Sequence, residues 1–83
     1  MEHRTVVVDD NVELTLVGLL REYGPAHASL TIEPGQTVRE VVQELGFNPE
    51  LVAMVMVNGR QKSKDHPLRP GDKVKLLPLV GGG

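Results

Sequence analysis

Three stretches of the chain alternate apolar and polar side chains, which is the pattern of a β-strand buried on one face. They are residues 12–18, residues 28–33 and residues 72–77. In the last stretch, lysines alternate with valine and leucine. The first two follow one another closely, so we expect them to pair as a hairpin. Between them, residues 19–23 lose the alternation and predict a helical turn.

Residues 37–46 carry the clearest helix signal. Thr37 and Glu40 have the spacing of a capping box, in which a threonine side chain and a glutamate side chain satisfy free N–H groups at the helix start. The apolar residues that follow fall at i, i+3, i+4 and i+7 and make one stripe. They are Val38, Val41, Val42 and Leu45. Gly46 supplies a C-terminal stop. A short helix with one apolar side must lie across a sheet.

The longest apolar run, residues 51–57, predicts a central strand that is buried on both faces, with Met54 and Met56 as core residues. Asn58-Gly59 follows and is a strong signal for a two-residue hairpin turn. Residues 60–63 are charged and predict a short return strand at a sheet edge.

A loop is expected between this hairpin and the final strand, with Leu68 reaching from it into the core. Pro70-Gly71 has the sequence of the centre of a type II turn, which leads into the final strand at Asp72. Pro78 has no N–H to donate, so regular strand pairing is expected to end there.

The order strand, strand, helix, strand, short strand, strand predicts an α+β fold with the β-grasp, or ubiquitin-like, layout. In this layout a mixed sheet of four to five strands carries one main helix on one face. We expect residues 1–11 to be an extension that either adds a strand or frays, residues 12–80 to form the domain, and residues 81–83 to form a flexible glycine tail.

The composition of the chain excludes several classes of function. The net charge is −2 and the pI is about 5.8, which argues against nucleic acid as a partner. The chain has no cysteine, which excludes disulfides, thiolate metal sites and a cysteine nucleophile and is consistent with a cytoplasmic protein. No apolar run is long enough to span a membrane, and the first residues do not resemble a signal peptide. The three histidines share no motif with an acid or a serine, so no metal site is expected.

The basic residues are concentrated in the last third of the chain. Nine of the eleven acids lie before Leu51, whereas the residues after it include six bases and two acids. The bases are Arg60, Lys62, Lys64, Arg69, Lys73 and Lys75. This distribution fits either a solvated basic face or a face that steers docking to an acidic partner.

The final strand runs directly into Gly81-Gly82-Gly83, with no linker between them. Glycine has no Cβ, so this segment is narrow enough to enter a restricted channel in a partner. A frayed end is the simpler interpretation. The direct connection to a strand favours a functional tail, because the fold then fixes how far the terminal carboxylate extends from its surface.

From about residue 12 to Gly83 the chain resembles the ubiquitin-like sulfur carriers, that is, the small subunit of molybdopterin synthase (MoaD) and the thiamine-pathway carrier ThiS. The stretches that carry the resemblance are Leu20-Arg21-Glu22-Tyr23-Gly24, Val57-Asn58-Gly59, Asp65-His66-Pro67-Leu68, Gly71-Asp72-Lys73-Val74, Leu77-Pro78 and Gly82-Gly83. The first and third of these are more similar to the molybdopterin branch.

The resemblance implies a carrier rather than an enzyme. A partner of the ubiquitin-activating type (MoeB/ThiF-like) would use ATP to adenylate the Gly83 carboxylate, and a sulfur nucleophile would convert it to a thiocarboxylate. The sulfur would then pass to a cofactor precursor in the large subunit of molybdopterin synthase or in thiazole synthase. The chain itself is expected to bind no cofactor.

The expected contacts with partners fall into two groups. Val80, Gly81 and Gly82 would thread into the partner's active site, and a docking surface would lie next to them. We assign to this surface Lys73, Lys75, Leu77, Pro78, Leu79 and Arg60, because apolar residues on an otherwise polar strand face suggest contact with another protein. Burial of Leu77 and Leu79 in the core is the alternative.

Two other functions fit the same sequence. A ubiquitin-like modifier would also be adenylated at Gly83 but would then form isopeptide bonds with lysines. A plain protein-interaction domain would use its glycines only as a flexible end. The sequence does not separate these alternatives.

Overall fold

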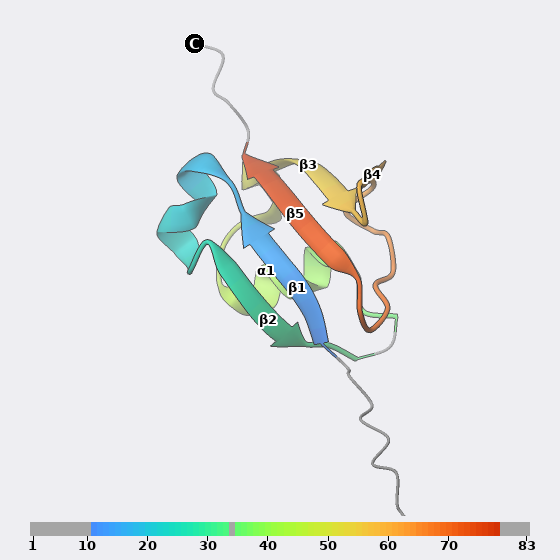
Figure 1. Cartoon of the computed structure of the whole chain (residues 1–83). Coiled ribbons are helices and arrows are strands. Elements are labelled where there is room, and N and C mark those ends of the chain that lie inside the picture. The colour runs from blue at the N-terminus through green and yellow to red at the C-terminus, as the bar shows by residue number, and fades with distance from the viewer. Residues whose placement is uncertain (1–10, 34, 79–83) are drawn as a thin grey trace, which may run out of the picture.

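The computed structural model describes residues 11–33 and 35–78, which form one five-stranded sheet with one α-helix across it (Figure 1). The strands are β1 (Asn11–Leu16), β2 (His27–Thr31), β3 (Val52–Val57), β4 (Arg60–Lys62) and β5 (Lys73–Pro78). Their order across the sheet is β2-β1-β5-β3-β4. The helix α1 is Val38–Leu45, and two short 3₁₀ helices are η1 (Gly18–Tyr23) and η2 (Pro49–Leu51). This confirms the predicted α+β β-grasp fold.

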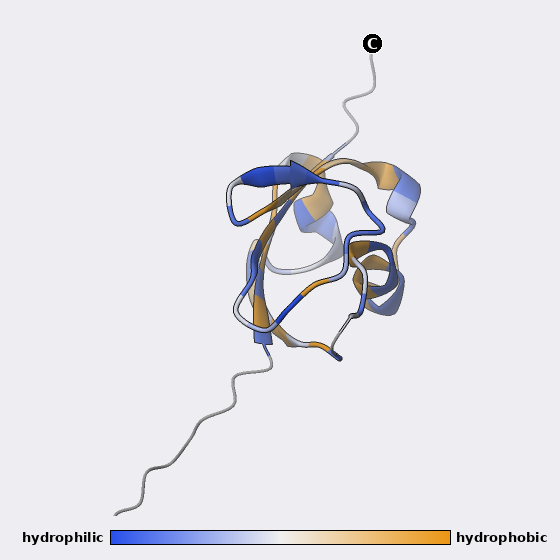
Figure 2. Ribbon diagram, turned by 90° about the vertical axis from the view of Figure 1, so that its right-hand side faces the viewer, coloured by the Kyte–Doolittle hydropathy of each residue, from blue (hydrophilic) through white to orange (hydrophobic). Residues whose placement is uncertain are grey.

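The sheet is mixed because β1 and β5 run parallel while every other pair is antiparallel. The predicted hairpin of β1 and β2 is confirmed, with η1 in the connection where the sequence indicated a helical turn. A parallel pair requires a crossover, and here α1 lies within the connection. It covers one face of the sheet and leaves the other face open (Figure 2).

The core lies between α1 and the sheet. Its fifteen buried residues come from every layer and are at most 6% exposed. They are Val12, Leu14, Leu16, Leu20, Ile32, Val38, Val41, Val42, Phe47, Val52, Val55, Val57, Leu68, Val74 and Leu76. Three residues of the predicted helix stripe, Val38, Val41 and Val42, meet the alternating strand residues in this core. The fourth, Leu45, and Leu30 of β2 are partly buried and pack against its margin.

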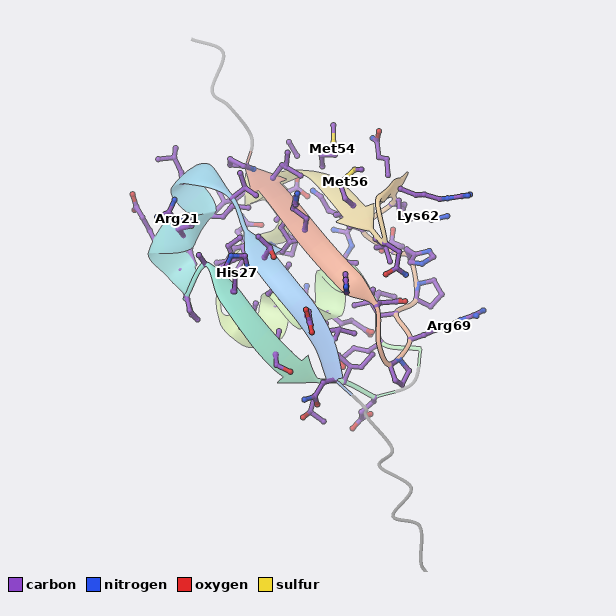
Figure 3. All side chains as sticks on the ribbon, in the orientation of Figure 1. Arg21, His27, Met54, Met56, Lys62 and Arg69 are labelled. Carbon is purple, nitrogen blue, oxygen red and sulfur yellow. The ribbon has the colours of Figure 1, made fainter. Side chains whose placement is uncertain are left out.

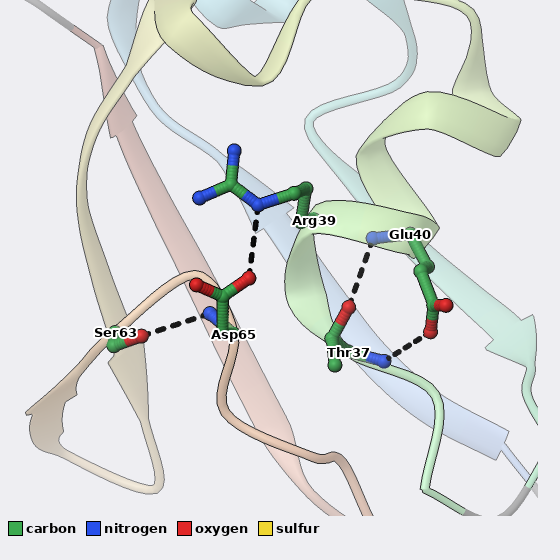
Figure 4. A network of polar contacts seen from close by, with 5 residues as sticks. All are labelled: Thr37, Arg39, Glu40, Ser63 and Asp65. Atoms are coloured by element: carbon green, nitrogen blue, oxygen red, sulfur yellow. Dashed lines mark hydrogen bonds and ion pairs between the residues drawn. The ribbon is translucent and has the colours of Figure 1, made fainter.

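The start of α1 forms the predicted capping box (Figure 4). Thr37 Oγ1 accepts a hydrogen bond from the Glu40 N–H at 3.2 Å, and Glu40 Oε1 accepts one from the Thr37 N–H at 2.9 Å. Gly46 ends the helix with φ 95°, a left-handed conformation that favours glycine. Both helix ends are therefore fixed by local chemistry.

The loop after β4 is fastened to the same helix end. Arg39 N donates to the Lys64 carbonyl at 2.8 Å, and Arg39 Nε donates to Asp65 Oδ1 at 2.9 Å (Figure 4). This hydrogen bond, followed by the positive charge itself, holds the pKa of the Asp65 carboxyl below its usual value, and Asp65 raises the pKa of Arg39. Leu68 then enters the core at 1% exposure, as predicted.

The two predicted turns are also confirmed. Asn58 and Gly59 have φ values of 54° and 83°, the pair of positive angles that a type I′ hairpin turn requires. Gly71 has φ 91°, and the Asp72 N–H donates to the Arg69 carbonyl at 3.1 Å, as in a type II turn centred on Pro70-Gly71.

One prediction about the strands is wrong. β3 lies inside the sheet, but only one of its faces is buried: Val55 and Val57 are in the core, whereas Met54 is 38% exposed and Met56 is partly exposed. The methionines are therefore not core residues. Methionine and valine both count as apolar in a hydropathy pattern, so residues 51–57 form a continuous apolar run. The strand nevertheless alternates between a face covered by the core and an open face.

Candidate functional site

The strand that leads toward the glycine tail is the central strand of the sheet. β5 pairs with β1 on one side and with β3 on the other. Val74 and Leu76 anchor it in the core at 2% and 0% exposure. β5 is therefore held by hydrogen bonds on both edges and by its buried side chains in the core. Pro78, the last described residue, has a fixed position relative to the rest of the domain.

Pro78 has contacts of its own. It lies opposite Val52, and a register shift between Val52 and Met54 marks a bulge at this end of the pair. A Cβ placed on Gly18 would lie only 3.2 Å from Pro78 Cγ, and Gly18 has φ +60°. η1 therefore begins in close contact with the end of β5, and both the space and the backbone angle favour glycine at position 18.

The open face of β5 carries three of the predicted docking residues. Lys73 and Lys75 are exposed, and Leu77, next along the same face, is partly buried. Leu77 lies opposite Met54 in the register, and Lys75 lies opposite Met56. We call Met54, Met56 and Leu77 the apolar strip. Figure 3 shows the two methionines together on β3 near the C-terminal end of β5.

Farther from Pro78, toward the start of β5, the open face becomes polar. A depression of about 370 Å³ is lined by Glu13, Thr15, Lys73 and Lys75 and, at the border with the apolar strip, by Met56. His27 also lines it and hydrogen-bonds through Nδ1 with Thr15 Oγ1 at 3.1 Å. A partner at this face would meet an apolar end near Pro78 and a lysine-bearing middle.

Arg60 lies elsewhere. It is opposite Val57, whose side chain is in the core, so the register places Arg60 on the opposite face of the sheet from Lys73 and Lys75. The structure therefore groups Lys73, Lys75, Leu77 and Pro78 but does not bring Arg60 to them. The remaining predicted site residues, Leu79, Val80, Gly81, Gly82 and Gly83, lie outside the described residues. So do residues 1–10 of the expected extension 1–11, whose last residue, Asn11, is the first residue of β1.

Sequence reasoning missed Met54 and Met56, and it also missed Leu19. Leu19, on η1, is 67% exposed and follows directly on the glycine that contacts Pro78. The loss of alternation at residues 19–23 was the available signal for Leu19, since a short 3₁₀ turn of sequence Gly-Leu-Leu-Arg-Glu-Tyr cannot bury every apolar side chain. For Met54 and Met56 the available signal was the alternation Met-Val-Met-Val, which places the two methionines on one face of the strand and the two valines on the other.

The described part of the chain contains no metal-binding cluster. No group of three histidine, cysteine, aspartate or glutamate side chains there is placed to hold a metal ion. The ion pair Arg39–Asp65, with side chains 38% and 69% exposed, fastens a loop to a helix. Residues 11–33 and 35–78 also contain no helix that is long and apolar enough to cross a membrane.

Solved structures with the same fold include a modifier protein, a putative molybdopterin converting factor subunit and Urm1. Small archaeal modifier protein 1 of Haloferax volcanii is 20% identical with a TM-score of 0.67, over 84% of this chain and 98% of that one. A putative molybdopterin converting factor subunit 1 from Pyrococcus furiosus is 24% identical with a TM-score of 0.64, again over 84% and 98%. Urm1 from Trypanosoma brucei is 17% identical with a TM-score of 0.67, over 94% and 100%.

These likenesses show the shared fold. The sequence model of the ThiS family matches residues 14–83, which is most of the chain and includes its last glycines. The match begins within β1 and takes in η1, the apolar strip and all of β5. The chain therefore belongs to the ThiS family of small ubiquitin-like carrier and modifier proteins.

Proposed function

We propose that this protein is a sulfur carrier whose Gly83 carboxylate is adenylated by a partner enzyme, converted to a thiocarboxylate and used in molybdopterin biosynthesis. The observation that carries the proposal is that the ThiS family match continues through residue 83. The fold supports it, because the segment after Pro78 continues from the central strand, whose end is held on both sides.

The chemistry needs an accessible carboxylate and little else from this chain. A carboxylate resists nucleophiles because it is charged and resonance-stabilised. Its attack on the α-phosphorus of ATP releases pyrophosphate and gives an acyl-adenylate with AMP as leaving group. Hydrosulfide then attacks the carbonyl carbon, AMP departs and a thiocarboxylate remains. If a protein persulfide attacks instead, a second thiol must cleave the resulting acyl disulfide.

The chain's own contribution is positioning. Five residues follow Pro78, and a fully extended segment of that length reaches roughly 17 Å. Glycines at the last three positions leave the carbonyl of Gly83 without neighbouring side chains, so attack from either side is sterically open. The apolar strip and Lys75 lie beside the strand end and would contact the partner that holds the tail.

The molybdopterin assignment is supported by the segments Leu20-Arg21-Glu22-Tyr23-Gly24 and Asp65-His66-Pro67-Leu68 and by the likeness to the Pyrococcus furiosus protein. A role in thiazole synthesis shares every step up to the thiocarboxylate. A ubiquitin-like modifier is the second candidate, since the modifier structures match this fold as well as the converting factor does. The partner enzyme would be a MoeB/ThiF-like adenylating enzyme in each case.

Intact-mass spectrometry of the protein purified from its native cell tests the carrier chemistry. We expect a fraction of the molecules to gain the mass difference between sulfur and oxygen, and we expect this fraction to vanish in a variant that lacks Gly83. Adding the purified large subunit of molybdopterin synthase and the pterin precursor should consume the thiocarboxylate. Transfer to thiazole synthase alone would move the assignment to the thiamine pathway.

Two results would count against the carrier. The first is normal cofactor synthesis by the Gly83 deletion variant. The second is recovery of the chain only in isopeptide linkage to lysines of other proteins, which would favour the modifier. No basic residue lies close before the tail, so a protease other than trypsin is needed to leave a short remnant.

A further inference from the structure

A second surface stands apart from the tail, at the β4 edge of the sheet. A groove of about 350 Å³ lies there between β4 and the loop that precedes β5. Its lining includes Arg60 and Lys62 from β4 and His66 and Arg69 from the loop. We call these four residues the basic groove. In Figure 3, Lys62 and Arg69 extend from the same side of the molecule although they come from different segments.

The acids nearest to the basic groove are already engaged. Asp72 Oδ1 accepts a hydrogen bond from Asn58 Nδ2 at 2.9 Å, and Asp72 Oδ2 accepts one from the Arg69 N–H at 2.9 Å. Asp65 pairs with Arg39, which is the only ion pair formed within residues 11–33 and 35–78. Arg60, Lys62 and Arg69 therefore form no ion pair with an acid of the described chain, and Asp72 is the one carboxylate that lines the groove beside them.

The groove is also held in shape without a ligand. Asn58 Oδ1 accepts from the Lys73 N–H at 2.9 Å, and the Asn58 N–H donates to the Lys73 carbonyl at 2.8 Å. With the bond to Asp72, these contacts fasten the β3–β4 turn to the start of β5. A surface that is ordered before binding loses less entropy when a partner docks.

The type of ligand follows from what the groove offers. Its backbone N–H groups do not form an anion-binding cradle, because those of Leu68, Arg69, Gly71 and Asp72 already donate to protein acceptors. What remains are cations on long side chains, which suit spaced carboxylates. The net charge of −2 does not favour a long polyanion such as nucleic acid.

We propose that the basic groove binds a short segment rich in aspartate and glutamate on a partner protein. The groove lies at the β4 edge of the sheet, two strands from β5, whereas the tail continues from β5 itself. A partner held at the groove would leave the tail free for another active site. This proposal goes beyond the carrier chemistry and does not depend on it.

A titration of the isotope-labelled full chain with an oligoglutamate peptide, followed by nuclear magnetic resonance, tests the proposal. We expect the signals of Arg60, Lys62 and Arg69 to move, and binding to weaken as salt is added. Lys62→Glu should weaken binding about tenfold, because it replaces an attraction by a repulsion. Arg21→Glu is the matched control: it changes the net charge equally but lies on η1, across the sheet (Figure 3), and should change binding by about twofold or less.

The amide spectrum of each variant checks that it is folded, and Arg69→Gln provides a second, milder test of the groove. Equal losses in Lys62→Glu and Arg21→Glu would show an effect of net charge and overturn the proposal. So would peptide-induced shifts confined to Lys73 and Lys75, or equally tight binding of inorganic phosphate or duplex DNA. The titration is repeated with the Gly83 deletion, which should bind the peptide unchanged, so failure here is distinct from failure of the carrier function.

Discussion

The same substitution at two neighbouring positions of β5 should have very different consequences. Leu76 is 0% exposed and lies in the core, whereas Leu77 is partly buried on the open face opposite Met54. Leu76→Glu loses about 2–3 kcal/mol of apolar burial. It also places an unpaired carboxyl in the core, at a cost of roughly 2–7 kcal/mol. A domain of 83 residues has a total stability of roughly 4–12 kcal/mol, so this variant should be largely unfolded.

Leu77→Glu should keep the fold. Its side chain already reaches solvent, and the new carboxylate lies on the same face as Lys75, so we expect a cost of about 1–2 kcal/mol. For a domain of this size that corresponds to a fall in Tm of roughly 4–16 °C. On the proposed function, the charge in the apolar strip should weaken binding of the adenylating enzyme by about tenfold or more.

Thermal unfolding followed by circular dichroism, together with calorimetric titration against the adenylating enzyme, measures both effects. The reasoning fails if Leu77→Glu unfolds like Leu76→Glu, because Leu77 would then belong to the core. It also fails if Leu77→Glu binds the enzyme as tightly as the unmodified chain, because the apolar strip would then have no part in docking.

Three further predictions concern the stability of the domain and are measured by urea unfolding. Thr37→Ala removes the hydroxyl of the capping box and should cost about 0.5–2 kcal/mol; an unchanged midpoint would mean that the cap adds nothing. Asn58→Gly should lose the two side-chain hydrogen bonds, to the Lys73 N–H and to Asp72 Oδ1. Asn58→Ala should lose the same bonds and about 1–2 kcal/mol more, because residue 58 has a left-handed backbone at φ 54°. Equal stability of Asn58→Gly and Asn58→Ala would show that the left-handed backbone of residue 58 does not destabilise the alanine variant. Asp65 has a pKa below that of the unfolded chain, so the stability it contributes is present above the unfolded value and is lost as the pH falls through the folded one. Asp65→Asn should therefore be less stable than the unmodified chain near neutral pH and equal to it in strong acid, and a difference that persists in acid would exclude this ion pair as the cause.

The features that the sequence predicted well are set by residues close together in the chain. The capping box of Thr37 and Glu40 lies within one turn, and the Asn58-Gly59 turn needs only two residues that accept positive φ. The fold class followed from the order of such elements. The family resemblance was equally accessible, because it rests on short segments and on the final glycines.

The sequence by itself determined which residues of each strand share a face and where the helix starts and stops, because these depend on local spacing and local hydrogen bonds. Only the tertiary structure decided which strands are neighbours. That choice put β5 between β1 and β3, left Met54 and Met56 on the open face beside Leu77, and turned Arg60 away from Lys75 toward Arg69. The physical reason is that hydropathy records how apolar a side chain is, whereas burial depends on which distant segment covers it.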